Sequence, residues 1–536
     1  MTPQISNVLL ISPLDMFLSY GLRLVSSHLQ KNGITTTMVF LPSSTEIWQL
    51  FYNQQYRGYK DAVLKQIARL AADVDLIGIT MMTMDKHRVQ QLVSSLETTH
   101  KPIILGGVHP TIDPEDALKM TGLINIGEGY DSLVEYCRNP HNNTINNIAK
   151  SVDGELIINN CRPAIENLDS LAFPDFGIDN HYVLLSNTIV PLSKHIQEKL
   201  LGTVYHQFAT FGCPFSCTYC INNTLKRIGP GYNRYRCHSP DYIIDEIKYG
   251  LALSPRIQYV NFPDDGFLSM SEETIEEFAR KYREQIGLPF SVMGIIPEFV
   301  TQRKIDMLVD AGLKRVRIGL QSANAEALNI YRRPAKPDRY REIHETFEKH
   351  RRLVFPYYDI IVDNPLVDNE RELLDTIHTL LEFRGRYTLL LFSLRFYPNT
   401  ELYSRAAPLN LPKRYYEDPY TDYDRTLLNY VLTIMRITNN RAIIRGLLYV
   451  YRKRGNIKIP GFVFSVNKHL FILRCGIQHV IKGDMSGIPY LVVRCIGCIS
   501  RLVSPLGMLY RRWQRRSSVP RGASPAHTGI GDRKGL

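Results

Sequence analysis

Three cysteines at a close and regular spacing constrain this chain more than any other feature. In the stretch FGCPFSCTYCINN, Cys213, Cys217 and Cys220 follow the pattern C-x3-C-x2-C, and Tyr219 comes directly before the last of them. Thiolates at such spacing bind zinc or an iron–sulfur cluster. Zinc usually takes four protein ligands, and no fourth Cys or His lies near in a suitable pattern. Three thiolates on a cubane cluster would leave one iron open to bind a small molecule through an amine and a carboxylate.

The length and the cysteine usage indicate a multidomain protein of a reducing compartment. A chain of 536 residues is too long for one core and suggests several domains. Of its nine cysteines, three belong to this motif and four are scattered singly, which is not a disulfide framework, so we expect a cytoplasmic protein. Cys495 and Cys498 form an isolated C-x2-C pair. Hydrophobic filler in an apolar segment explains this pair better than a metal or redox role.

The net charge of +12 is concentrated at one end of the chain. From residue 511 to residue 536 there are seven Lys or Arg and one Asp. No basic stripe interleaved with aromatic residues precedes this tail, so we expect no nucleic-acid partner. We also expect no signal peptide, because the sequence begins directly with a strand pattern. No apolar run reaches the ~18 uncharged residues of a membrane span.

The first third of the chain alternates short apolar runs with helical periodicity. Such alternation predicts a Rossmann-like, doubly wound parallel sheet over residues 1–150. The predicted strands, with the turns that end them, cover residues 8–13, 36–41, 76–80, 102–107 and 124–129. Ligands of such sheets lie over the carboxyl ends of the strands. The residues at or just after these ends are Thr80, Gly106, Gly107, His109, Gly127 and Glu128. The glycines would let a bulky ligand approach the backbone closely.

A second series of β/α units follows a connector at residues 151–200. Six predicted strands, at residues 205–210, 257–262, 290–295, 315–320, 358–362 and 388–395, alternate with helices. They predict a partial (β/α)6 barrel over residues 201–420, with functional residues at the carboxyl ends of its strands. Asp264 and Asp265 follow the second of these strands, and Gln321 and Ser322 follow the fourth.

The β/α rhythm stops after about residue 420. We predict a mainly helical region over residues 421–516 and a disordered basic tail over residues 517–536. An apolar segment at residues 490–510 precedes a cluster of four arginines with one Trp, at residues 511–516. This arrangement is compatible with weak contact to an anionic membrane surface. A helix that caps the barrel, followed by a disordered tail, is the simpler interpretation, and we favour it.

The cysteine loop and the segments after it resemble the radical S-adenosylmethionine (SAM) enzymes. The resemblance implies that the three cysteines hold a [4Fe-4S] cluster whose open iron binds SAM, with Tyr219 against the adenine. It places Asp264 and Asp265 near the methionine ammonium, and Gln321 and Ser322, where relatives often have Glu-Ser, near the ribose. The sequence YPNTEL at residues 397–402 resembles the YPGTEL ending of cobalamin-associated members, with Asn399 in place of Gly.

The first third of the chain resembles the cobalamin-binding domain that precedes many radical SAM domains. Domains that coordinate cobalt from below carry an Asp-x-His-x-x-Gly loop after the first strand. Here that loop reads LDMFLSYG, at residues 14–21, and contains no His. If cobalamin binds, its cobalt has no histidine ligand from the protein, and we expect Phe17 or Leu18 to face the metal. His109 is expected to contact the corrin or its tail.

The resemblance covers about residues 1–420 and implies a cobalamin-dependent radical SAM C-methyltransferase acting on a small molecule. In such enzymes an electron from the cluster cleaves SAM, and the 5′-deoxyadenosyl radical removes hydrogen from an unactivated carbon. The substrate radical then takes the methyl group of methylcobalamin. The electron would come from an external donor of the flavodoxin or ferredoxin type. The alternatives are a cyclase or oxidative-rearrangement enzyme that binds cobalamin without methyl transfer, and a cobalamin or iron–sulfur sensor that is not an enzyme.

Overall fold

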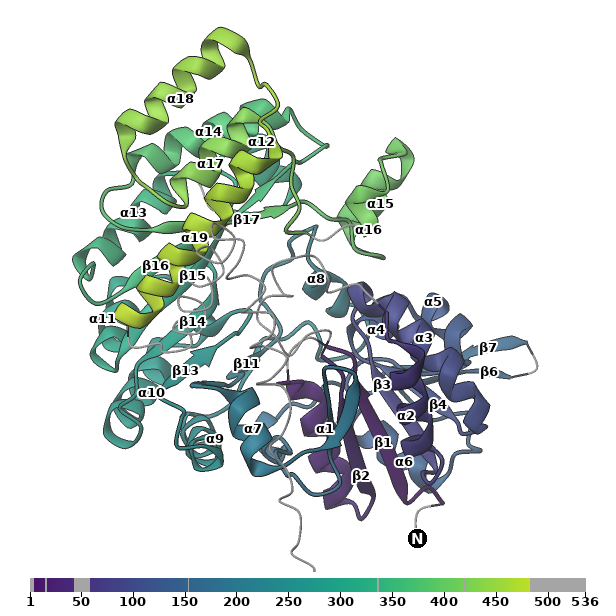
Figure 1. The fold of residues 1–536 in the computed structure, drawn as a ribbon. Helices are drawn as coiled ribbons and strands as arrows, with labels where there is room; N and C mark the ends of the chain where they lie inside the picture. Colours follow the sequence, from purple (N-terminus) through teal and green to yellow (C-terminus); the bar gives the residue numbers. More distant parts are fainter. Residues whose placement is uncertain are drawn as a thin grey trace, which may run out of the picture.

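The computed structural model describes residues 4–14, 17–42, 58–152, 154–334, 337–417 and 420–482. Its N-terminal part is a sheet covered by helices, and its central part is a second sheet that curves into a partial barrel (Figure 1). A group of helices follows at the C-terminal end of the described chain. The predicted α/β class, with a doubly wound first domain and a β/α barrel after it, is confirmed.

The first sheet has nine strands in the order β7-β6-β5-β4-β3-β1-β2-β8-β9. Strands β5, β4, β3, β1, β2 and β8 form a parallel central block. Strands β6 and β7 at one edge and β9 at the other are added antiparallel. The strand order reverses between β1 and β3, where the crevice of a doubly wound sheet binds its ligand. The strands are β1 (Asn7–Ser12), β2 (Thr35–Phe40), β3 (Leu76–Thr80), β4 (Ile103–Gly106), β5 (Leu123–Asn125), β6 (Ile148–Val152), β7 (Glu155–Ile158), β8 (Tyr182–Leu185) and β9 (Thr188–Pro191).

Successive side chains of β1 enter two separate cores, one on each face of the sheet. Leu9 and Ile11 pack into a cluster with residues of α2, α3 and α5. Val8 and Leu10 pack into a second cluster with residues of α1 and α6. Because both faces are buried, the strand reads as a nearly continuous apolar run. The helices are α1 (Tyr20–Lys31), α2 (Asp61–Ala71), α3 (Lys86–Leu96), α4 (Val108–Ile112), α5 (Pro114–Thr121) and α6 (Tyr130–Arg138).

The segment expected as a connector, residues 151–200, is largely built into the first domain. It supplies β7, β8 and β9 to the sheet and ends in α7 (Lys194–Leu201). These strands have only four residues each, and those of β7 and β9 are exposed or half-buried, so they depend on pairing with the sheet more than on a sequence pattern. The connection between the two halves is therefore shorter than the sequence suggests.

The second sheet is the partial barrel, with six parallel strands in the order β10-β13-β14-β15-β16-β17. A separate two-stranded ribbon, β11 paired antiparallel with β12, carries the start of the cysteine loop. The strands are β10 (Val204–His206), β11 (Thr210–Phe211), β12 (Arg236–Cys237), β13 (Tyr259–Phe262), β14 (Phe290–Ile295), β15 (Leu313–Gln321), β16 (Phe355–Val362) and β17 (Thr388–Ser393).

Side-chain caps fix where several barrel helices begin. The hydroxyl of Ser239 accepts a hydrogen bond from Tyr242 N at the start of α9, and Ser271 and Thr301 do the same for α10 and α11. The helices are α8 (Ile221–Leu225), α9 (Pro240–Leu253), α10 (Glu272–Gln285), α11 (Gln302–Asp310), α12 (Ala325–Ile330), α13 (Pro337–Lys349), α14 (Asn369–Glu382), α15 (Glu401–Ala406), α16 (Arg414–Glu417), α17 (Leu427–Met435), α18 (Arg441–Arg454) and α19 (Gly461–Ile481).

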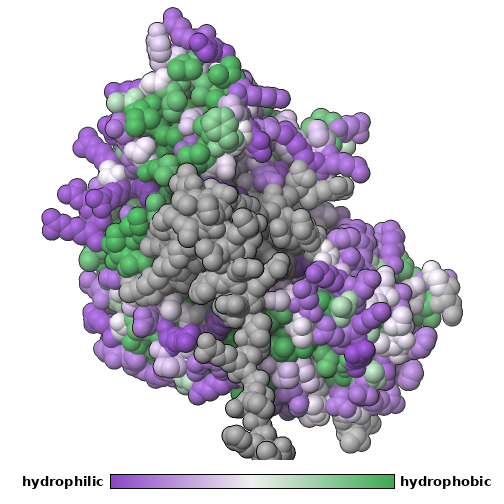
Figure 2. Space-filling model, viewed as in Figure 1, coloured by the Kyte–Doolittle hydropathy of each residue, from purple (hydrophilic) through white to green (hydrophobic). Residues whose placement is uncertain are grey.

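The last three helices leave an apolar surface on the molecule. Hydrophobic residues gather where α18 and α19 lie in Figure 2, and the exposed ones include Ile443, Tyr449, Phe462, Val466 and Leu470. Within the described residues, no helix is long and apolar enough to cross a membrane. The predicted apolar segment at residues 490–510, the arginine cluster after it and the pair Cys495 and Cys498 lie outside the described residues.

The two halves of the chain contact each other through specific side chains. Asn399 adopts a left-handed backbone conformation with φ of 57°, which Gly and Asn tolerate better than other residues. Its amide Nδ2 donates to Ile112 O of α4, 2.7 Å away, and its carbonyl accepts from Thr224 of α8. The replacement of Gly by Asn in the YPNTEL stretch therefore keeps the turn and adds a bond between the halves.

Candidate functional site

A cavity of about 380 Å³ lies at the carboxyl edge of the first sheet, at the reversal between β1 and β3. Residues from the ends of β3, β4 and β5 form one wall, and the cysteine loop forms part of the opposite one. The lining includes Leu14, Ser19, Tyr20, Thr80, Gly106, Gly107, Gly127, Glu128, Gly212, Cys213, Asn222 and Arg236. The two halves of the chain thus enclose one common space.

Glycines shape the wall of this cavity in two ways. A Cβ added to Gly106 would meet nothing within 4 Å, so any larger side chain there would project into open space. Gly107 and Gly127 have φ of 101° and 73°, which other residues rarely adopt. A Cβ on Gly127 would also lie 2.5 Å from the hydroxyl of Tyr232. Only Gly106 thus leaves room beside the backbone, and the role of these glycines in close approach of a ligand stays a prediction.

The loop after β1 differs from what the sequence suggests. Phe17 is buried in the core against Phe40, with ring centroids 4.8 Å apart, and Leu18 packs against the barrel core instead of lining the cavity. The buried guanidinium of Arg23 donates to the carbonyls of both residues and so fixes the loop in this conformation. The prediction that Phe17 or Leu18 faces the ligand is therefore wrong. Leu14 and Tyr20 line the cavity in their place.

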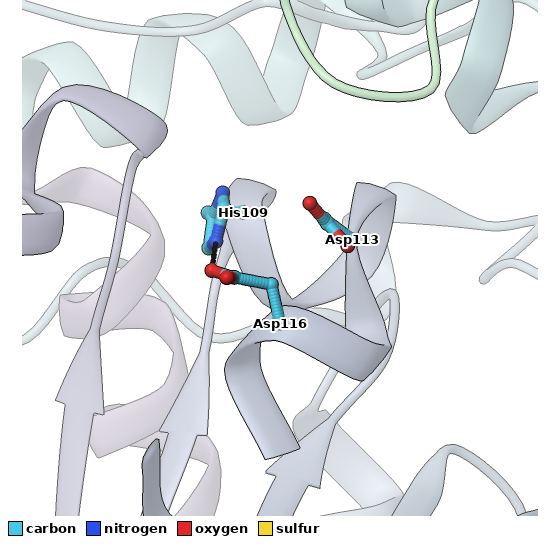
Figure 3. A group of neighbouring side chains, drawn as sticks. All are labelled: His109, Asp113 and Asp116. Atoms are coloured by element: carbon cyan, nitrogen blue, oxygen red, sulfur yellow. Dashed lines mark hydrogen bonds and ion pairs between the residues drawn. The ribbon is translucent and has the colours of Figure 1, made fainter. Parts of the chain in front are cut away.

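His109 does not line the cavity either. Its Nε2 lies 3.0 Å from Asp116 Oδ2 and its Nδ1 lies 3.2 Å from Thr83 Oγ1, so both ring nitrogens are engaged (Figure 3). Asp113 lies beside this pair, and the three side chains offer ligand atoms close enough for one metal ion. Lys86 already donates to Asp116 at 2.7 Å, however, and supplies the positive charge that an ion would bring. The prediction of a corrin contact for His109 is not supported.

Glu128 reaches the cavity but is also part of the interface between the halves. Its Oε1 lies 2.6 Å from Nη2 of Arg236 and its Oε2 accepts from Ile165 N. Its backbone N–H donates to the hydroxyl of Tyr232. Two contacts from the second half of the chain and one from the segment between β7 and β8 thus hold the loop after β5, and with it the neighbouring Gly127.

The cysteine loop is fastened to the barrel at its first strand. Thr210 of β11 donates through both its backbone N–H and its hydroxyl to Oδ1 of Asp264, at 2.6 and 2.7 Å. Burial raises the pKa of Asp264 to about 7, against the opposing effect of these hydrogen bonds. Its Oδ2 is buried with no hydrogen-bond partner among the described residues. Asp264 therefore positions the loop and does not reach out of it.

Asp265 is the carboxylate that faces the cysteines. Its Oδ2 accepts from Asn222 Nδ2 at 2.9 Å, and its negative charge contributes to the raised pKa values of Cys213 and Cys220. The side chain of Asp265 is in contact with solvent, but many protein atoms surround it. This partial loss of water raises the pKa of its carboxyl group. Of the two aspartates, Asp265 is the one free to bind an ammonium group.

The three thiols of the cysteine loop lie farther apart than the ligands of a single zinc ion. Two thiolates on one tetrahedral zinc lie about 3.8 Å apart. The sulfurs of Cys213, Cys217 and Cys220 do not all lie within 4.8 Å of one another, since the only such set of possible ligands in the described residues contains no cysteine. They are nevertheless electrostatic neighbours, and burial raises the pKa of Cys220 to about 12. Arg333, which the sequence did not single out, places Nη1 3.7 Å from the sulfur of Cys217.

The other residues predicted to bind SAM differ in how accessible their side chains are. Tyr219 lies edge-on to Tyr331, with ring centroids 5.2 Å apart, directly beside the cysteine loop. Gln321 ends β15 with φ of 69° and stays partly accessible. Ser322 is fully buried, and its hydroxyl accepts from Asn324 N within the same turn. Gln321 can thus reach a ligand in the barrel mouth, while Ser322 lies behind it.

Glu246 of α9 is a buried carboxyl group that the sequence gave no reason to select. The hydroxyls of Tyr20 and Tyr205 donate to its two oxygens, at 2.9 and 3.2 Å. Burial raises the pKa of Glu246 to about 8 despite these donors. Since Tyr20 lines the cavity, this carboxyl group of the second half fixes a wall residue of the first. Only the packing of the two halves brings it to the site.

Two family models match separate parts of the chain. The B12 binding domain matches residues 7–136, and the Radical SAM superfamily matches residues 208–379. A curated relative, the bacteriochlorophyllide d C-8(2)-methyltransferase of Chlorobaculum tepidum, is 24% identical over 266 residues, which are 48% of this chain and 52% of the relative. The chain therefore spans about half the length of that relative.

Solved structures share the fold over most of the chain. The radical SAM methyltransferase TsrM from Kitasatospora setae, with cobalamin and a [4Fe-4S] cluster bound, matches with a TM-score of 0.59 at 14% identity, over 76% of this chain and 75% of that one. The cobalamin-dependent SAM radical enzyme OxsB, in its apo form, matches with a TM-score of 0.60 at 14% identity, over 94% of this chain and 75% of that one.

Proposed function

Because the chain belongs to the cobalamin-binding radical SAM enzymes, we propose that it is a methyltransferase that acts on an unactivated carbon of a small molecule. The observation that carries the proposal is the common cavity. Gly106 and Gly127 of the first sheet and Cys213 of the cysteine loop line the same space. Methyl transfer to a carbon radical needs both cofactors beside one substrate, since reacting groups must be held near contact.

The donor set of the cysteine loop suits the SAM-binding cluster. The thiols of Cys213, Cys217 and Cys220 would hold three irons of a [4Fe-4S] cluster, and Arg333 would offset part of its negative charge. Asp265 would accept hydrogen bonds from the ammonium of SAM. Tyr219 would lie against the adenine, and Gln321 would hydrogen-bond the ribose hydroxyls. When bound, the cluster and SAM supply a radical that removes hydrogen from carbon, and methylcobalamin supplies the methyl group.

The first sheet offers a cradle for the corrin without a histidine ligand. Among the described residues that line the cavity none is a histidine, and the loop after β1 presents Leu14 and Tyr20. The hydroxyl of Tyr20 is held by Glu246, so it is not free to act as a ligand. We therefore propose that no protein nitrogen binds the cobalt, which is one of the ways in which a protein tunes this cofactor.

The proposal is tested by anaerobic reconstitution of the protein with iron, sulfide and hydroxocobalamin, followed by incubation with SAM and a low-potential reductant such as a flavodoxin. We expect both 5′-deoxyadenosine and S-adenosylhomocysteine to form. The appearance of 5′-deoxyadenosine alone would instead support a radical enzyme without methyl transfer. The absence of both products would contradict an enzymatic role and favour a cobalamin or iron–sulfur sensor.

A further inference from the structure

Helix α19 packs one of its sides against the barrel. Phe471 and Cys475 on this side line a cavity of about 320 Å³ between the helix and the barrel strands. Arg474 donates hydrogen bonds to the carbonyls of Arg436 and Tyr387, which attaches the helix to the end of α17 and to the start of β17. These contacts fix which side of α19 is turned away from the barrel.

The side of α19 that is turned away carries a continuous apolar stripe. Its members follow one another at steps of three or four residues, which is the spacing of one face of a helix. All of them except the half-buried Leu473 are exposed, and Phe462 is 73% exposed. The stripe runs along the whole helix, over about 30 Å. The members of this α19 stripe are Phe462, Val466, Leu470, Leu473, Ile477 and Ile481.

Exposed apolar side chains continue beyond both ends of the α19 stripe. Tyr449 of α18 and Ile457 in the connection to α19 are exposed, and Figure 2 shows hydrophobic side chains gathered over α18 and α19. At the other end, Lys482 donates to the carbonyl of Arg352, which places the exposed Leu353 near the end of α19. Single exposed apolar residues are ordinary, but a continuous patch indicates a surface that binds something.

The segment that contains α17, α18 and α19 has no acidic residue. Between residues 425 and 482 there are eleven Lys or Arg and no Asp or Glu. Residues 1–424, by contrast, contain 44 Lys or Arg against 50 Asp or Glu. The positive charge is thus concentrated on the elements that carry the apolar patch.

Several of these basic side chains lie next to the start of the α19 stripe. Arg452, Lys453 and Arg454 end α18, and Lys458 lies four residues before Phe462. All four basic side chains are exposed, and none of them forms an ion pair with a residue that the structure describes. Positive charges that the protein itself does not balance therefore accompany the exposed apolar side chains.

Charge decides which partner fits this patch. Residues 483–536 contain nine Lys or Arg and two Asp, so covering the patch with them would bring like charges together. A second copy of the chain on the same patch would do so as well. The fitting partner accepts apolar side chains and carries negative charge beside them. The surface of an anionic lipid bilayer has both properties at the depth that a helix lying on it reaches.

We propose that α18 and α19 attach the protein to an anionic membrane surface. Helix α19 lies in the plane of the interface, with the α19 stripe inserted among the lipid headgroups. The basic side chains from Arg452 to Lys458 pair with lipid phosphates beside it. The helix does not cross the bilayer, because its opposite side packs on the barrel. This attachment is independent of the proposed function and of the arginine cluster at residues 511–516.

Co-sedimentation of the full-length holoprotein with lipid vesicles tests the proposal. At low salt, vesicles of phosphatidylglycerol and phosphatidylcholine in equal parts should bind the protein at least ~10-fold more tightly than vesicles of phosphatidylcholine alone. Phe462→Ser combined with Val466→Ser, called the stripe variant, should weaken this binding at least ~10-fold, because the apolar insertion is lost. Replacing Lys453, Arg454 and Lys458 with Gln should remove most of the preference for the anionic vesicles.

Two controls locate the effect on α19. Leu156→Ser combined with Ile158→Ser is the matched control, because both side chains are 48% exposed on the edge strand β7 of the first sheet, and it should leave vesicle binding unchanged. A full-length variant in which the four arginines at residues 511–516 are replaced by Ser should still bind the anionic vesicles. It should lose this binding when the two substitutions of the stripe variant are added.

Three results would overturn the proposal: no binding of the parent to the anionic vesicles, equal binding of the two kinds of vesicle, or equal binding of the parent and the stripe variant. In the first case the patch is covered by residues 483–536 or by a second copy, and light scattering of the parent and the stripe variant distinguishes these two. Circular dichroism should show that the stripe variant folds, because both substituted side chains are exposed. The variant with the three Gln substitutions leaves the stripe intact and tests the charge independently.

Discussion

At the scale of single residues, Glu246 shows how the interface of the two halves sets a protonation state. The groups that face it are Tyr20 of α1, Tyr205 of β10, Tyr242 of its own helix and Asp264 after β13. Burial outweighs the hydrogen bonds from the tyrosines and raises the pKa to about 8. At neutral pH the carboxyl group is therefore mainly protonated. Gln207 next to it donates through Nε2 to Oε2 of Glu246, 3.5 Å away.

Glu246→Gln tests this protonation state through the pH dependence of stability. The folded pKa of about 8 exceeds the ordinary value of 4.5, so the unfolded chain loses the proton first as pH rises. The contribution of Glu246 to the free energy of unfolding is thus fully present below the unfolded pKa and falls as pH rises towards the folded one. The slope is at most about 1.4 kcal/mol per pH unit. We expect the variant to gain stability relative to the parent between pH 5 and pH 8 in denaturant titrations.

A pH-independent difference between Glu246→Gln and the parent would contradict this assignment. Asp264 and Glu372 have raised pKa values of about 7 and 8, and both act in the same direction. Both groups occur in the two proteins: Glu372 is not coupled to Glu246 and cancels in the difference, whereas Asp264 faces Glu246 and contributes to it in the same pH range.

Gly106 tests the cradle at the same scale. Because a Cβ at this position meets open space, Gly106→Leu should fill part of the common cavity without disturbing the packed core. We expect hydroxocobalamin to bind at least ~10-fold more weakly, which corresponds to about 1.4 kcal/mol. Titration followed by absorbance measures this. The control is Gly446→Leu, since Gly446 also faces open space but lies on the exposed surface of α18. Unchanged binding in both variants would place the corrin elsewhere.

At the scale of elements, the sequence predicts most of the regular structure. The periodicity of apolar residues is strong in buried parallel strands such as β1 and β15, and it placed the six barrel strands within a few residues. The hairpin of β8 and the edge strand β9 was missed, because short strands depend on pairing rather than on pattern. The sequence also does not predict which way the side chains point in the loop after β1. That direction depends on Arg23, which is near in sequence but is held by contacts with the distant residues Asp175 and Phe176.

The residues of the candidate site also differ in whether the sequence predicts them. The cysteines, the glycines and Asp265 were found from the sequence because each has a local motif. Arg333 and Glu246 were not, because each acquires its role from a partner distant in the chain.

The cysteine loop supports a prediction at the scale of one element. Replacing any one of the three loop cysteines, as in Cys213→Ala, Cys217→Ala or Cys220→Ala, should abolish the visible absorbance of the [4Fe-4S] cluster. It should also abolish all cleavage of SAM. Each thiolate is one of three protein ligands, so no spare ligand can replace it. Cys237→Ala is the matched control, because Cys237 lies on β12, opposite Thr210 at the base of the loop. Iron and sulfide analysis is the measurement, and full iron content in any one of the three loop variants would contradict the assignment.

At the scale of the whole molecule, the proposed function requires that two cofactors share one space between two domains. Bonds from Asn399 to Ile112, from Arg236 to Glu128 and from Glu246 to Tyr20 hold the domains together around the cavity. The proposed contact of the basic tail with an anionic membrane concerns residues 511–516, outside the described part of the chain. It stays a separate proposal, on which the position of the cofactors does not depend.

Electron paramagnetic resonance of the holoprotein tests the common cavity most directly. The measurement is made on frozen samples in which cobalamin is in the cob(II) state and the cluster is reduced, so that both carry an unpaired electron. If both occupy the space between Gly106 and Cys213, their signals should show spin–spin broadening or splitting that neither shows alone. A spectrum that is the plain sum of the two separate signals would contradict the account, because it would place the corrin away from the cysteine loop.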